Sequence, residues 1–189
     1  MNAVQIRTVL DAIIAQKLCT FLGVFPRNLV PSTPAITKLP ACYVANSDDE
    51  HQPGQHWLAI FIDNEKNLEF FDSYAQPPAV YGLHKIGVCT SNKTLLQSLD
   101  STVCGHYCIY YLYNRSLGHS LHAIVSIFSP TSLACNDSRV RMFVRNLSKP
   151  GTQCVQCKCN CTSACPCKQI CVARCNCTIK AYKSKLTMC

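Results

Sequence analysis

Apolar residues follow two different spacings in the first half of the chain, one typical of a helix and one typical of buried strands. Between residues 4 and 18 they recur at helical spacing with polar residues between them, which predicts an amphipathic helix. Residues 57–62 are instead a continuous apolar run, and residues 67–71 are a second, largely apolar run of residues that favour strands, joined to the first by a polar turn at 63–66. This pattern predicts a β-hairpin, and the lack of strict alternation indicates that the hairpin is buried on both faces.

The rest of the pattern completes an α+β domain with a central antiparallel sheet flanked by helices. Prolines and a glycine interrupt residues 21–40, which predicts a surface loop. Pro150 ends the globular part, so we expect a domain at 1–149 and a separate tail at 150–189. The other expected elements are short strands at 41–45 and 94–96, a short helix at 79–88, a helix from Cys104 to Gly118, a helix at 121–128, and a last helix capped by Asn136-Asp137-Ser138.

Composition indicates an intracellular protein that contains many thiols. Of the 189 residues, 48% are hydrophobic, yet no apolar run is long enough to cross a bilayer. Arg7, Asp11 and Gln16 interrupt the layout that a signal peptide needs. Thiols stay reduced inside cells, so the 16 cysteines are interpreted as metal ligands or catalytic groups before disulfides. A secreted disulfide scaffold is the alternative, and it fits poorly with the missing signal sequence.

Charge is distributed unevenly along the chain. The net charge is +8, and Asp137 is the last acidic residue. Ten of the 18 lysines and arginines lie beyond it. A positive block of this kind attracts polyanions, with nucleic acid the usual partner, although a solvated tail without a specific partner has the same composition.

The stretch from Gln97 to Cys104 has the pattern of a cysteine nucleophile at the start of a helix. Asp100, Ser101 or Thr102 is expected to cap that helix. The positive end of the helix dipole and the free backbone N–H groups there favour the thiolate, which is the reactive form. The same N–H groups, together with the Gln97 amide, suit the oxyanion of a tetrahedral intermediate. A lone buried cysteine is more often structural, so this interpretation requires a histidine and a carboxylate elsewhere.

The predicted hairpin supplies both groups. His56 lies just before the first strand and Asp72 just after the second, so the turn between the strands brings these two residues together. A carboxylate beside an imidazole fixes its tautomer and stabilises its charged form, and the imidazolium in turn stabilises a thiolate. The other histidines, including His106 beside Cys104, lack such a setting.

Three motifs together resemble the adenovirus-type cysteine proteases, the adenain family, and most closely those carried by virus-like DNA transposons. The seven-residue step from Gln97 to Cys104 fits adenain better than the SUMO-deconjugating proteases, which have a shorter step and an Asp where Val103 stands here. The resemblance covers roughly residues 5–147. Its motifs are His56-Trp57-Leu58-Ala59, Phe71-Asp72-Ser73 and Gln97-x6-Cys104-Gly105-x2-Cys108.

The resemblance implies a papain-like fold reached by a permuted order of catalytic residues. It implies Cys104 as the nucleophile, His56 as the general base and later acid, Asp72 as the residue that orients His56, and Gln97 with the Cys104 N–H as oxyanion donors. It also implies hydrolysis after small residues in viral or virus-like precursors such as capsid proteins. An activating peptide and DNA are expected partners, and the nucleus or virion of a host cell is the expected location.

The tail is dense in cysteine and basic residues and has no apolar core of its own. Thiolates at such close spacings suit tetrahedral zinc, and the pattern resembles metallothionein-type clusters and the cysteine-rich CXC modules that bind DNA. An unstructured or disulfide-linked tail is the alternative. The expected zinc ligands are Cys154, Cys157, Cys159, Cys161, Cys165, Cys167, Cys171, Cys175 and Cys177.

Three functions therefore remain open from the sequence. The first is a cysteine endopeptidase that needs no cofactor for catalysis and carries zinc in its tail. The second is a protease that removes ubiquitin-like modifiers, because both kinds of enzyme cut after small residues with shared machinery. The third is a zinc-dependent nucleic-acid-binding protein with an inactive protease fold.

Overall fold

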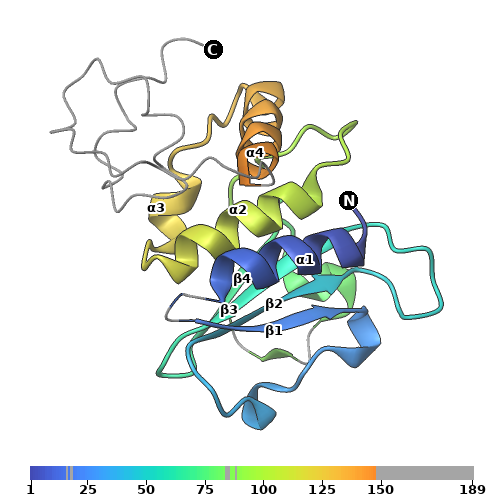
Figure 1. Cartoon of the computed structure of the whole chain (residues 1–189). Helices are drawn as coiled ribbons and strands as arrows, with labels where there is room; N and C mark the ends of the chain where they lie inside the picture. Colours follow the sequence, from blue (N-terminus) through green and yellow to red (C-terminus); the bar gives the residue numbers. More distant parts are fainter. Residues whose placement is uncertain (16, 18, 84–85, 88, 148–189) are drawn as a thin grey trace, which may run out of the picture.

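A mixed five-stranded sheet forms the centre of the structure, and its strands lie side by side in chain order (Figure 1). The computed structural model describes residues 1–147 except 16, 18, 84, 85 and 88, so the tail and its expected zinc ligands lie outside the described residues. The three inner strands are antiparallel, but each edge strand runs parallel to its neighbour. The strands are β1 (Thr20–Phe25), β2 (Ala41–Asn46), β3 (Trp57–Ile62), β4 (Leu68–Phe71) and β5 (Cys89–Ser91).

Helices flank this sheet, so the described part of the chain is an α+β fold. In Figure 1, α1 and α2 cross one face of the sheet side by side, and α4 stands above α2, on the side away from the sheet. None of the helices in the described residues has the length and hydrophobicity needed to cross a bilayer. The helices are α1 (Ala3–Ile14), α2 (Cys104–Ser116), α3 (Leu121–Val125) and α4 (Leu133–Leu147), and short 3-10 turns occupy η1 (Arg27–Leu29), η2 (Thr33–Ala35) and η3 (Pro78–Tyr81).

The sheet is buried on both faces, which confirms the prediction from its continuous apolar strands. Every residue of β2 is buried, and so are all residues of β3 after Trp57. The face under the helices belongs to a core cluster with Ile6, Leu10 and Tyr107, while a second cluster containing Ile60 fills the opposite face. Because both faces are covered, the hairpin is fixed in position and orientation.

The first helix is close to its predicted position. It begins at Ala3 with a capping box, in which the Asn2 side chain accepts from the Gln5 N–H and the Gln5 side chain accepts from the Asn2 N–H. Its buried face consists of Ile6, Leu10 and Ile14. Val4, the first of the apolar residues whose spacing predicted this helix, is instead 72% exposed.

Several sequence predictions about the secondary structure are wrong. The expected surface loop at 21–40 contains β1, and the wholly antiparallel sheet is corrected to a mixed one by the parallel pairing of β1 and β5. No strand forms at 94–96, because β5 ends before that segment. Where a helix was expected at 79–88, the structure has the 3-10 turn η3. The last helix starts upstream of its expected cap, so Asn136 and Asp137 lie inside α4.

Asn136 and Asp137 do not cap α4 but connect this helix to the segment that precedes α2. The Asn136 side-chain amide donates to the Leu96 carbonyl at 3.0 Å. The Tyr107 hydroxyl lies 2.8 Å from the same carbonyl and 3.0 Å from the buried Asp137 carboxylate. These bonds hold the chain next to Gln97 against two helices.

We predict that Tyr107→Phe lowers the free energy of unfolding by about 1–3 kcal/mol, because it removes a hydrogen bond to the buried carboxylate of Asp137. Urea unfolding measures the change. In a double-mutant cycle, Tyr107→Phe should cost less in an Asp137→Asn background, since a neutral amide leaves no charge buried. An equal loss in the free energy of unfolding in both backgrounds would show that the Tyr107–Asp137 hydrogen bond is not the cause of the destabilisation.

Candidate active site

His56 and Asp72 meet at one end of the central hairpin, as predicted. His56 lies directly before β3 and Asp72 directly after β4, and these strands are antiparallel neighbours. The Nε2 atom of His56 is 2.6 Å from Oδ1 of Asp72, and both side chains are buried. The backbone of His56 is fixed as well, because its N–H donates to the Ser47 hydroxyl and its carbonyl accepts from the Ser47 N–H.

The Asp72 carboxylate is fully buried, and several donors surround it. Oδ1 also accepts from the backbone N–H of Tyr74 at 3.0 Å. Oδ2 accepts from the Gln76 N–H and from the Tyr81 hydroxyl, each at 2.9 Å. Four hydrogen bonds therefore compensate the carboxylate for the loss of water and fix its orientation towards His56.

Cys104 is the first residue of α2 and lies on the other side of the imidazole. The Cys104 thiol and the His56 imidazole line the same cavity, and each group shifts the pKa of the other. Asp72 occupies Nε2, which leaves Nδ1 as the free ring nitrogen. The backbone N–H groups of Trp57 and Gly105 also lower the pKa of the thiol. The structure thus brings a thiol, an imidazole and a carboxylate together in one group.

The expected side-chain cap on α2 is absent. Val103 occupies the cap position, and no side chain accepts a hydrogen bond from the first turn, so the prediction of Asp100, Ser101 or Thr102 as a cap is wrong. A capping side chain would compete for the N–H groups at the start of the helix. Without one, those donors face Cys104.

The surroundings shift the pKa values of both reacting groups. Burial alone lowers the pKa of His56, but its hydrogen bonds with Asp72 and Cys104 outweigh burial and raise that pKa to about 9. Burial raises the pKa of Cys104, whereas the hydrogen bond with His56, its charge and two backbone N–H groups lower the pKa overall. Both shifts favour the charged forms, a thiolate beside an imidazolium.

Aromatic rings enclose the imidazole and form the walls of a cavity of about 310 Å³. The Tyr74 ring stacks on His56 with its centroid 4.8 Å away, and the Tyr81 ring lies 5.6 Å away. The Trp57 indole N–H donates to the Met1 carbonyl at 3.0 Å. The lining contains no Lys, Arg, Asp or Glu, and comprises Met1, Gly54, Gln55, His56, Trp57, Tyr74, Ser101, Thr102 and Cys104.

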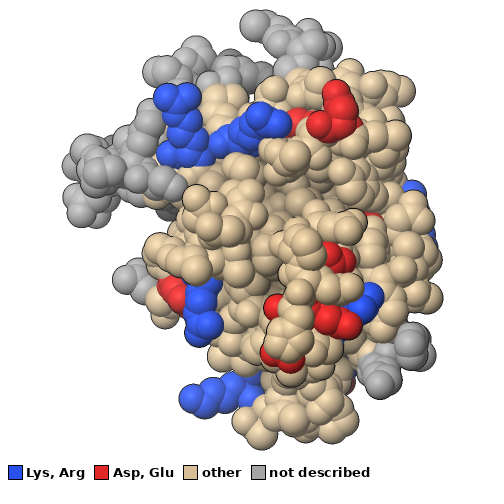
Figure 2. All heavy atoms as spheres, turned by 90° about the vertical axis from the view of Figure 1, so that its right-hand side faces the viewer, with Lys and Arg blue, Asp and Glu red and all other residues tan. Residues whose placement is uncertain are grey.

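The Lys, Arg, Asp and Glu side chains of this region lie outside the cavity lining. Figure 2 shows the face on the right of Figure 1, where uncharged residues make up most of the surface and acidic side chains form separate groups. A ligand in the cavity therefore contacts aromatic rings, hydroxyls and backbone groups.

Gln97 is buried beside this cavity, and all of its side-chain atoms are engaged. Its carbonyl oxygen accepts from the Ser73 hydroxyl at 2.8 Å. Its amide nitrogen donates to the Ser101 carbonyl at 2.7 Å and to the Tyr74 hydroxyl at 3.1 Å. The amide therefore has no N–H left over for an oxyanion in this arrangement.

Sequence reasoning missed three residues of the site, Tyr74, Tyr81 and Asn92. The Asn92 side chain accepts from the Asp72 N–H and donates to the Asp72 carbonyl, which secures the backbone of the carboxylate. Asn92 and Tyr81 lie far along the chain from His56, and no motif marks them. Only Tyr74 carried a signal, because it directly follows the Asp72-Ser73 pair.

The remaining histidines of the described residues do not join this group. His51 is largely exposed and lies 3.6 Å from Glu50. His106 follows Cys104 in sequence, but burial and the nearby positive charge of the N-terminus lower its pKa to about 4. His106 is therefore neutral at physiological pH and makes no contact with the thiol–imidazole pair among the hydrogen bonds of the described chain.

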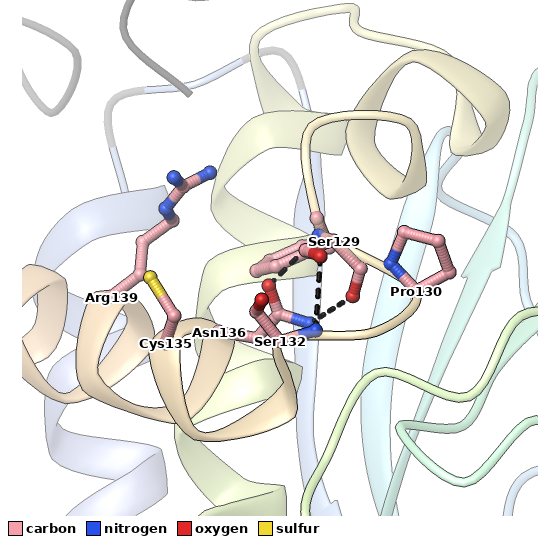
Figure 3. A pocket seen from close by; sticks show the side chains of 7 residues that line it. Ser129, Pro130, Ser132, Cys135, Asn136 and Arg139 are labelled. Atoms are coloured by element: carbon pink, nitrogen blue, oxygen red, sulfur yellow. Dashed lines mark hydrogen bonds between the residues drawn. The ribbon is translucent and has the colours of Figure 1, made fainter. Parts of the chain in front are cut away.

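A second cavity of about 290 Å³ lies beside the start of α4, and its lining lacks histidine and carboxylate groups (Figure 3). The Asn136 side chain fills its floor by pairing with the backbone N–H and carbonyl of Ser129 at 3.0 and 2.7 Å. Among the described residues, no group of three or more His, Cys, Asp or Glu side chains is arranged to hold a metal ion. The first cavity is thus the candidate active site.

Comparison with known proteins adds a structural likeness. Neither a protein-family model nor a curated protein sequence matches the chain. A solved structure described as the central domain of the uncharacterized Lpg1148 protein from Legionella pneumophila is similar, with a TM-score of 0.45 and 17% sequence identity. The match covers 78% of this chain and 97% of that one.

We predict that His56→Asn slows alkylation of Cys104 by iodoacetamide at pH 7 by about tenfold or more, because the thiol loses the group that lowers its pKa. Mass spectrometry of the labelled protein gives the rate, and Cys104→Ala identifies labelling at other thiols. The exposed His51→Asn is the matched control and should leave the rate unchanged. Equal rates in His56→Asn and wild type would show that His56 does not activate the thiol.

Proposed function

We propose that the protein is a cysteine endopeptidase of the adenain type, with Cys104 as nucleophile, His56 as general base and acid, and Asp72 as the residue that orients His56. One observation carries this proposal. A thiol with a lowered pKa lies at the wall of a cavity beside an imidazole with a raised pKa, and that imidazole is hydrogen bonded to a fully buried carboxylate. A cysteine with a purely structural role does not require an imidazole and a carboxylate beside it.

In the proposed reaction, the Cys104 thiol gives its proton to Nδ1 of His56, and the sulfur attacks the carbonyl carbon of the scissile peptide bond. The carbonyl electron pair moves to oxygen, and this oxyanion accepts from the backbone N–H of Cys104 at the uncapped start of α2. When the C–N bond breaks, the leaving amine takes the proton from His56. Water then gives a proton to His56 and attacks the thioester, and cleavage of the C–S bond restores the thiolate.

The cavity supports substrates with small uncharged residues at the cut. Trp57 and Tyr74 line the cavity together with Cys104, and no Lys, Arg, Asp or Glu side chain belongs to its lining. This fits the expected cleavage after small residues in viral or virus-like precursor proteins. The order His56, Asp72, Gln97, Cys104 supports a permuted papain-like site in which Gln97 belongs to the oxyanion machinery.

Removal of ubiquitin-like modifiers remains the second candidate, since the same site serves both reactions. Peptides ending in Gly-Gly and ubiquitin-like conjugates offered side by side distinguish the two functions. Preferred cleavage within an extended precursor supports the endopeptidase, whereas a requirement for a folded modifier supports the alternative. A protein that cleaves neither substrate would favour the third candidate, a nucleic-acid-binding protein with an inactive protease fold.

We predict that Cys104→Ala abolishes peptide hydrolysis without unfolding the protein, because it removes the attacking sulfur while the small side chain preserves the helix. Cleavage of a Gly-Gly-containing peptide and thermal unfolding measure the two effects. Cys89→Ala at the edge strand β5 is the matched control and should retain activity. Activity in folded Cys104→Ala would rule out the proposed mechanism.

We predict a bell-shaped pH dependence of kcat/KM. The active pair needs a thiolate and a protonated imidazole, so activity rises as pH passes through the lowered pKa of Cys104, below the ordinary value of 9.0. Activity then falls as pH passes through about 9, where His56 loses its proton. Rates across pH 5–10 on one peptide test this profile, and an activity that keeps rising above pH 10 would contradict the thiolate–imidazolium pair.

A further inference from the structure

The buried amide of Gln97 leaves an open question about the oxyanion. One of its N–H groups donates to the Ser101 carbonyl at 2.7 Å and the other to the Tyr74 hydroxyl at 3.1 Å. The Ser73 hydroxyl fixes the amide from the other side at 2.8 Å. An oxyanion contacted directly by this amide would have to displace one of these bonds, and Tyr74 lines the cavity whereas Gln97 does not.

The Tyr74 hydroxyl itself is well prepared to donate. It accepts from Gln97, and no acceptor for its own proton is present among the hydrogen bonds of the described residues. Its ring is held against His56 at a centroid distance of 4.8 Å, and it lines the cavity together with Cys104. Burial and the nearby charges of Cys104 and Asp72 raise the pKa of Tyr74, so the phenol keeps its proton during the reaction.

We propose that the Tyr74 hydroxyl is the side-chain donor to the oxyanion, and that Gln97 is a positioning residue that holds and polarises this hydroxyl. The inference rests on the proposed cysteine acyl chemistry and assigns one further catalytic residue to it. A hydroxyl that accepts an N–H bond becomes a stronger donor, because hydrogen bonds in series polarise one another. Tyr74 and the Cys104 N–H then share the developing charge from two directions.

A peptide aldehyde ending in Gly-Gly tests the assignment without any hydrolysis. The Cys104 sulfur adds to the aldehyde carbon, the carbonyl electron pair moves to oxygen, and this oxygen lies where the oxyanion forms. Alkylation of the same sulfur by iodoacetamide releases iodide and forms no oxyanion. Comparison of the two reagents therefore separates oxyanion stabilisation from thiol activation.

Tyr74→Phe keeps the ring on His56 and removes only the hydroxyl. It should weaken aldehyde binding and lower kcat/KM by about 100-fold, while the rate and pH profile of iodoacetamide alkylation stay unchanged. Tyr113→Phe, near the far end of α2, is the matched control and should change neither. Because Gln97 acts through Tyr74, Gln97→Ala should add little to the loss in a Tyr74→Phe background.

The outcomes separate this inference from the proposed function. Unchanged or tighter aldehyde binding by Tyr74→Phe would overturn the assignment, and tighter binding would mean that the hydroxyl blocks Gln97. A parallel loss of alkylation would also overturn it, since Tyr74 would then act on the thiol. A wild-type protein that binds the aldehyde and cleaves no peptide would refute the endopeptidase proposal alone, because the Tyr74 comparison is made on the aldehyde.

Discussion

The hydrogen bond between His56 and the Asp72 carboxylate connects the fold of this protein to its reactive thiol. At 2.6 Å, and with the carboxylate wholly buried, this bond keeps the imidazole in one orientation, and together with Cys104 it outweighs the burial that disfavours the charge of His56. The surrounding strands and hydrogen bonds maintain the relative positions of His56 and Asp72. The antiparallel pairing of β3 and β4 brings the two residues together, and Tyr81 and two backbone N–H groups hold the carboxylate.

The helix that carries Cys104 completes the arrangement from the other side of the imidazole. Packing of α2 against β3 and α1 places the sulfur at the end of the hairpin, and the missing side-chain cap leaves N–H groups directed at it. The segment with Gln97 is fixed by Tyr107 and by Asn136 of α4. Three separate parts of the chain therefore converge on one sulfur atom, and each is held by buried contacts rather than by a flexible loop.

The sequence correctly predicted those parts of the fold and site where a catalytic residue type stands at the end of an apolar run. The hairpin, the start of α2 and the meeting of His56 with Asp72 follow from apolar runs that end in polar residues. The parallel edge strands were not predictable, because β1 lies in a segment broken by proline and glycine, and pairing direction leaves no mark in a short strand. The role of Tyr74 was equally hidden, since it depends on which hydrogen bonds of Gln97 are already made, a property of side-chain orientation in three dimensions.

The neighbour-by-neighbour order of the sheet has a consequence for how the protein matures. Each strand pairs with the one made just before it, so during synthesis the imidazole and its carboxylate can meet while the cysteine is still in the ribosome or newly emerged. A thiol in a nascent chain lacks the surroundings that ionise it. The surroundings that lower the pKa of Cys104 are therefore complete only once α2 has packed against β3.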